Sequence, residues 1–141
     1  MTLTLSVAVL RAVQAHGEAA YPNEGAGFLL GRMTGEAKTV VASLPLANKW
    51  DSAGQYHRFQ LSSQDWLQAE AEGDRQGLDL VGCFHSHPDH PAVPSEFDRE
   101  HALPWFSYVI TAVQQGRAVV SRSWLLADDR SAFAEESIET S

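Results

Sequence analysis

The sequence predicts an α/β (α+β) fold, in which helices flank one sheet of mixed strands. Three observations predict this class. The chain has 141 residues, a length that suits a single domain spanning 1–141. Segments with helical spacing of apolar residues alternate along the chain with short apolar runs typical of strands. Residues 78–84 form a nearly continuous apolar run, which is typical of a central strand buried on both faces.

The first third of the chain predicts one helix followed by a hairpin. Residues 6–20 carry apolar side chains at helical spacing, and Ser6 can cap the start of this helix. Pro22 ends it, because proline cannot continue a helix. Two apolar runs at 27–31 and 39–46 flank a Thr-Gly-Glu turn and therefore predict two antiparallel strands.

The middle of the chain predicts a loop and a second helix ahead of the central strand. Residues 48–58 are polar and contain a glycine, which indicates a loop. Residues 64–76 have apolar side chains on one side and acids on the other. A serine at position 62 or 63 can cap the start of this helix, and Gly77 fits its end.

The last third predicts a loop, a third helix and a second hairpin. Residues 89–94 contain two prolines and cannot form regular structure. A helix is expected from 95 to about 103, before the next proline. Strands are expected at 107–113 and 117–125, joined by a turn that contains glycine. The acidic tail, 128–141, is expected to end in a short helix.

Composition and charge argue against one class of partner, nucleic acids. Hydrophobic residues make up 44% and charged residues 20%, an ordinary globular balance. The formal net charge is −8, and residues 51–100 contain ten acids against three Lys or Arg. An acidic chain without a basic stripe is a poor match for phosphate backbones, so we expect no nucleic-acid partner.

The single cysteine and the apolar segments bear on location. Cys83 has no second cysteine to pair with, which fits a reducing compartment. The apolar N-terminus has no preceding Lys or Arg and no small-residue cleavage site, so we expect no secretory signal. No apolar run reaches the ~20 residues that a membrane span requires. We therefore expect a cytoplasmic protein without membrane contacts.

The motif His-Ser-His-Pro at 85–88 predicts a metal site. His85 and His87 are two residues apart at the end of a strand, so their side chains point to the same side. Asp98 follows one loop later and can complete a set of three ligands. Three protein ligands are typical of catalytic zinc, whose fourth position stays open. Ser95 shares the first turn of the next helix with Asp98.

Other interpretations of these residues remain open at this stage. Ser95 and Asp98 also fit a capping box at a helix start, and capping is compatible with metal binding. Cys83 precedes His85 by two residues and could join a Cys-His-His set. We favour Cys83 as a buried small apolar residue of the central strand. His90 is a spare imidazole that could contact the substrate or a metal ligand.

The combination of His-Ser-His-Pro, six residues, Ser, two residues and Asp resembles the JAMM (MPN+) metallopeptidase family. The family also carries an upstream Glu-x-x-Gly-x-Leu-x-Gly pattern, which the segment from Glu24 to Gly31 matches. The resemblance extends from about residue 5 to residue 126 and is closest to compact prokaryotic members. It implies a cytidine-deaminase-like MPN sheet.

The resemblance also implies a role for each site residue. His85, His87 and Asp98 would bind Zn²⁺, Glu24 would be the general base, and Ser95 would donate its hydroxyl to the oxyanion of the reaction intermediate. Without the resemblance, Glu24 could not be distinguished from the chain's other acids, among them Glu18, Glu36 and Glu96.

The implied function is hydrolysis of amide or isopeptide bonds that follow the C-terminal Gly-Gly of ubiquitin-like β-grasp proteins. The chain is about the size of the family's catalytic core, as in the prokaryotic members associated with sulfur-carrier proteins. The resemblance therefore implies a β-grasp sulfur-carrier protein as the substrate. The alternative is a non-catalytic MPN scaffold that binds a ubiquitin-like partner and uses the metal for stability.

Overall fold

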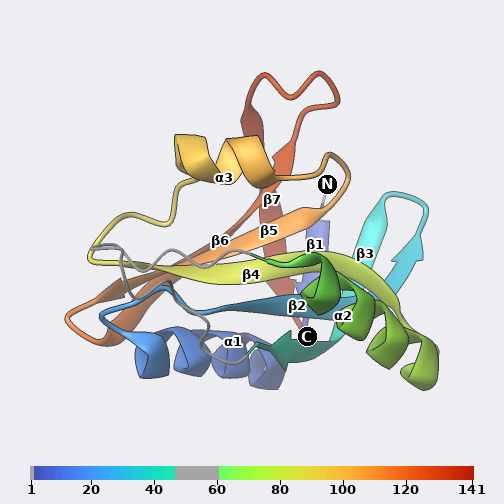
Figure 1. Ribbon diagram of the computed structural model, residues 1–141, viewed down its shortest axis with the longest axis horizontal. Helices are drawn as coiled ribbons and strands as arrows, with labels where there is room; N and C mark the ends of the chain where they lie inside the picture. The colour runs from blue at the N-terminus through green and yellow to red at the C-terminus, as the bar shows by residue number, and fades with distance from the viewer. Residues whose placement is uncertain (1, 47–60) are drawn as a thin grey trace.

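A computed structural model describes residues 2–46 and 61–141 of the chain, and the loop predicted at 48–58 lies outside this part (Figure 1). The described elements follow the order β1 (Thr2–Leu5), α1 (Val7–Ala20), β2 (Ala26–Thr34), β3 (Ala37–Pro45), α2 (Ser63–Gln76), β4 (Asp79–Pro88), α3 (Glu96–His101), β5 (Ser107–Gln114), β6 (Arg117–Leu126) and β7 (Phe133–Thr140). The helices in this part of the chain are too short or too polar to cross a membrane.

The strands form one closed sheet in the order β1-β3-β2-β4-β5-β6-β7. β1 closes it by pairing in parallel with both β3 and β7. β4 pairs antiparallel with β2 and parallel with β5, so strands of both directions meet at the centre. Figure 1 shows α1 and α3 on opposite sides of these strands. The predicted α/β class, a mixed sheet flanked by helices, is confirmed.

The predicted central strand is buried on both faces. Phe84 packs into a cluster of apolar side chains with Leu29 and Val81, under α1. Its neighbour Cys83 packs into a second cluster with Phe28 on the other face. Since side chains alternate along a strand, the histidines at 85 and 87 continue the Cys83 face.

The helix boundaries follow the predicted caps. The Ser6 side chain accepts a hydrogen bond at the start of α1. Ser62 and Asp65 form a capping box at the start of α2. Gly77 ends α2 with a φ of 69°, a left-handed conformation that costs glycine little. The sequence signals at helix ends were therefore correct here.

The prediction of a short helix in the acidic tail was wrong, because residues 133–140 form strand β7. β7 pairs with β6 on one side and with β1 on the other. β1 itself was not predicted, although its residues Leu3 and Leu5 are completely buried at 0% and 1% exposure. Pairing with two distant strands supplied the backbone hydrogen bonds, and this outweighed the local composition of the tail.

Candidate metal centre

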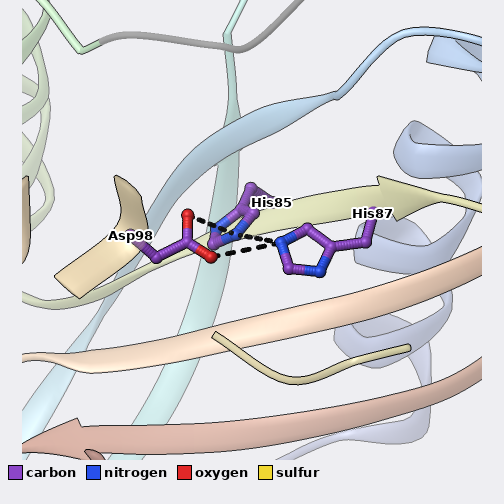
Figure 2. A group of neighbouring side chains, drawn as sticks. All are labelled: His85, His87 and Asp98. Carbon is purple, nitrogen blue, oxygen red and sulfur yellow. Dashed lines mark hydrogen bonds and ion pairs between the residues drawn. The ribbon is translucent and has the colours of Figure 1, made fainter. Parts of the chain in front are cut away.

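Three side chains converge where β4 ends and α3 begins (Figure 2). His85 Nε2 lies 3.3 Å from one Asp98 oxygen, and His87 Nε2 lies 3.2 Å from the other. The two Nε2 atoms are 3.1 Å apart. The ligand atoms of the three residues all lie within 4.8 Å of one another, which is close enough to hold one ion. The structure therefore brings together the three residues that the sequence predicted as ligands.

The position of the two histidines follows from the pairing of β4. Backbone register places His85 between Ala26 of β2 and Ile110 of β5. His87 pairs with Ala112 of β5, and its Nδ1–H donates to the Pro91 carbonyl at 2.9 Å. A carbonyl oxygen can only accept a hydrogen bond, so Nδ1 carries the ring hydrogen. In the neutral ring the free lone pair is then on Nε2. The lone pair is thus directed at the space shared with Asp98.

Asp98 is held by the helix cap that the sequence suggested. The Ser95 side chain accepts a hydrogen bond from the Asp98 amide at 3.1 Å. In return, Asp98 Oδ2 accepts the Ser95 amide at 2.8 Å. The capping-box interpretation is therefore confirmed, and it is compatible with a ligand role because Oδ2 also faces His87. The hydrogen of the Ser95 hydroxyl is not used by the cap, since Ser95 Oγ is the acceptor.

The electrostatics favour an ionised carboxylate beside the histidines. Burial raises the pKa of Asp98, but His85, His87 and the Ser95 amide lower it more, so the pKa lies well below its usual range. Burial lowers the pKa of His85, whereas Asp98 and Glu24 raise it, and the net pKa lies above 6.5. A negative pocket that attracts protons also attracts a metal ion, which replaces those protons on binding.

Glu24 is brought to this site by contacts that precede β2. The Gly25 amide donates to the Ser86 side chain at 2.8 Å, and the Ser86 amide donates to the Gly25 carbonyl at 3.0 Å. These two bonds continue the pairing of Ala26 with His85 by one residue. The Glu24 charge acts on His85, and both residues line one cavity. Among the acids of the described residues, the ones that line this cavity are Glu24 and Asp98.

Ser86 is a residue whose role sequence analysis missed. It is 2% exposed and faces away from the histidines, toward α1. A Cβ added to Gly17 of α1 would come within 2.9 Å of the Ser86 Cβ, so the two must approach closely. The available signal was a small polar residue between two histidines in a buried strand. Ser86 links α1 and the Glu24 segment to the strand that carries the histidines.

A cavity of about 250 Å³ opens beside the three converging side chains. Its polar lining includes Glu24, His85 and Asp98. Phe97 and His101 stack with ring centres 4.1 Å apart, and both line the cavity from α3. The remaining lining is mostly apolar and comprises Ala26, Leu61, Trp66, Cys83, Phe84 and Tyr108. Except for Cys83, sequence analysis assigned none of these residues to a site, since only the fold gathers them.

Cys83 and His90, the two other residues that the sequence offered for the site, lie in different environments. Cys83 is 4% exposed and belongs to the apolar cluster around Phe28. Burial raises the pKa of its thiol, which disfavours the thiolate that binds metals. His90 is exposed and is not among the residues that line the cavity. Within the described part of the chain, the group of ligand atoms close enough for one ion is formed without Cys83.

We expect Cys83→Ser to retain one zinc ion per chain. Serine keeps the size of the side chain, and the converging set of His85, His87 and Asp98 is left intact. Elemental analysis of the purified variant, beside the parent protein, measures this. Loss of the metal from a folded variant would restore the cysteine-ligand alternative.

The donor set fits a divalent metal ion. Two imidazole nitrogens and a carboxylate are common ligands of zinc and related metals, and three protein ligands leave a position for water or substrate. The hydrogen bond from His87 Nδ1 to Pro91 is the kind of outer contact that fixes a metal-binding histidine.

Comparisons with known proteins give the family. The fold is of the JAB/MPN type. A crystal structure of a JAB1/MPN domain protein from Archaeoglobus fulgidus aligns with a TM-score of 0.58 at 15% identity, covering 99% of both chains. Residues 6–127 match the family described as prokaryotic homologs of the JAB domain, and the chain belongs to that family. The resemblance to the JAMM/MPN group is thereby confirmed.

Two relatives have names that describe an activity. A desampylase of Haloferax volcanii is 31% identical over 103 residues, which cover 73% of this chain and 70% of that protein. A probable TtuB-protein conjugate cleaving protease of Thermus thermophilus is 32% identical over 110 residues, which cover 78% of this chain and 70% of that protein. These activities are stated in the names of the two relatives, to which this chain is similar in sequence.

Proposed function

We propose that the protein is a zinc-dependent metallopeptidase that hydrolyses the amide or isopeptide bond after the C-terminal Gly-Gly of a ubiquitin-like β-grasp protein. The observation that carries this proposal is the convergence of His85, His87 and Asp98 beside a cavity that is lined by His85, Asp98 and Glu24. Structural support for a metal alone would not need an acid in the same cavity.

His85, His87 and Asp98 would hold the zinc ion. A zinc ion held there would lower the pKa of water toward about 7 and would polarise the carbonyl to be attacked. Asp98 contributes the negative charge of the ligand set, and the Ser95 amide keeps its carboxylate oriented. The chain therefore supplies two neutral donors and one charged donor.

Glu24 is proposed as the general base. It takes a proton from the attacking water and returns it to the leaving amine, so that no anionic nitrogen has to leave. General acid–base catalysis of this kind contributes roughly 100- to 10,000-fold. The cavity that Glu24 lines also has apolar walls, which include Trp66 and Phe97.

Ser95 is proposed as the oxyanion donor. Its Oγ accepts the Asp98 amide, so its hydroxyl hydrogen is available for a further partner. One donor of this type is worth about 3–4 kcal/mol in the transition state.

The substrate class is supported by the two relatives. Their names refer to a desampylase and to a protease that cleaves TtuB-protein conjugates. On the strength of this sequence similarity, the protein is proposed to act on a conjugate of the same kind, with a β-grasp sulfur-carrier protein as the partner. The competing function is a scaffold that binds such a partner without cleaving it.

The test is to incubate the zinc-loaded protein with β-grasp carriers of its host that bear C-terminal extensions or lysine adducts, and to follow the masses. We expect the carrier to be released with its terminal Gly-Gly intact. The matched control is the same protein stripped of metal by a chelator, which should leave the masses unchanged. Stable binding of the carrier with no change of mass would favour the scaffold.

A further inference from the structure

The helix that carries Asp98 is short and lies near the surface. α3 has six residues; none is fully buried, and Phe97, Asp98 and Arg99 are half-buried. A helix this short is not stable by itself in water. Forming its first turn fixes the backbone of several residues and gains only one hydrogen bond. Its position, and with it the position of the Asp98 carboxylate, must come from contacts made by other parts of the chain.

Arg130 supplies such contacts at the C-terminal end of α3. Its guanidinium donates to the Ala102 carbonyl at 2.7 Å and to the carbonyls of Arg99 and Glu100 at 3.2 Å each. The last carbonyls of a helix have no partner within the helix, and a planar guanidinium can serve several of them at once. In return, the Arg99 side chain donates to the Arg130 carbonyl at 2.9 Å.

The turn that carries Arg130 is itself well ordered by hydrogen bonds. It joins β6 to β7 and lies next to α3 in Figure 1. Ala127 and Ala132 pair through their backbones, and the Arg130 amide donates to the Ala127 carbonyl at 2.8 Å. The Asp129 carboxylate accepts both the amide and the hydroxyl of Ser131. The guanidinium is therefore presented from a fixed support on the sheet.

The two ends of α3 have different anchors. At the start, the carboxylate of Asp98 itself forms the cap with Ser95, so the anchor and the proposed metal ligand are the same group. At the end, Arg130 holds the backbone and leaves the ligand free. The following chain is tied down by the Tyr108 hydroxyl, which accepts the Leu103 amide at 2.7 Å.

We propose that Arg130 is a positioning residue for the metal ligand Asp98: by binding the terminal carbonyls of α3, it holds this carboxylate where the two histidines can share an ion with it. The inference rests on the proposed metal centre. Groups that orient metal ligands typically change metal affinity 10- to 100-fold when they are replaced.

The test compares zinc affinity, measured by competition with a chromophoric chelator, in the parent protein, Arg130→Gln, Arg130→Lys and the control Arg122→Gln. Arg122 lies on β6 and is exposed, where it pairs with Glu135 at 3.4 Å. We expect 10- to 100-fold weaker zinc binding in Arg130→Gln. Lysine can serve fewer carbonyls, so Arg130→Lys should be intermediate, and Arg122→Gln should match the parent.

The sign of the effect separates positioning from charge. Removing a positive charge makes the chain more acidic, which by Coulomb attraction alone would strengthen the binding of a cation. A weaker affinity therefore requires a change in ligand geometry. The visible spectrum of the cobalt-substituted protein reports that geometry, and we expect it to change in Arg130→Gln but not in Arg122→Gln.

The outcomes are distinct when all measurements are made below the unfolding temperature of each variant. Parent-like zinc affinity and an unchanged cobalt spectrum in Arg130→Gln would overturn the positioning role alone. Failure of the parent protein to bind zinc would overturn the metal centre, and the role of Arg130 with it. If Arg130→Gln does not fold, Arg130→Lys decides: affinity and spectrum equal to the parent would overturn the proposal.

Discussion

Replacing Glu24 with glutamine is expected to reduce cleavage of a Gly-Gly-linked fusion by roughly 100- to 10,000-fold, while one zinc ion remains bound per chain. The amide of glutamine has the size of the carboxylate but cannot accept the proton of the attacking water. Glu24 lines the cavity beside His85 and Asp98, whereas the converging ligand atoms come from His85, His87 and Asp98. The chemical step should therefore fail without loss of the metal.

The measurement is turnover by mass spectrometry together with metal content by elemental analysis. Glu36→Gln is the matched control, because Glu36 lies in the turn between β2 and β3 and is exposed. We expect the control to keep the parent's turnover. Unchanged turnover in Glu24→Gln would rule out the assigned base, and loss of zinc in this variant would make Glu24 a ligand.

The second large effect is expected from His87→Gln, which should lose both the zinc ion and the activity. His87 is 6% exposed, and its Nε2 lies within 3.2 Å of ligand atoms of both His85 and Asp98. Removing this ring leaves two of the three ligands, and the carboxylate of Asp98 loses its contact with His87. Two ligands do not retain zinc against dialysis as three do.

His90→Gln is the matched control for this experiment, since it removes one imidazole from the same region of the chain. His90 is exposed and does not line the cavity, so its replacement should leave one zinc ion per chain. Metal content after dialysis and turnover of the same fusion are measured for both variants. Full zinc content in a folded His87→Gln variant would contradict the ligand assignment.

Local signals predicted much of the fold. Ser6, Ser62 and Gly77 mark helix ends because capping depends on the few residues around it. The run at 78–84 predicted a strand buried on both faces, and β4 has an apolar cluster on each side. In contrast, β7 was mistaken for a helix because its partners, β1 and β6, are far away along the chain.

Some features of the candidate site also follow from local sequence alone. The spacing of His85 and His87 within one strand determines that both rings share a face, and this follows from the period of a strand alone. Ser95 and Asp98 form the helix cap that their spacing predicted. These local relations were available from the sequence without any knowledge of the fold.

The sequence by itself determined the local geometry: which side chains share a strand face or a helix turn, and where the helices begin and end. Only the tertiary structure decided which distant groups meet. The pairing of Gly25 with Ser86 brings Glu24 to the cavity, and Arg130 binds a carbonyl just past the end of the helix that carries Asp98. The physical reason is the separation along the chain. Helix caps and strand alternation depend on neighbouring residues, whereas the contacts of Gly25 with Ser86 and of Arg130 with Ala102 join residues that are 61 and 28 positions apart.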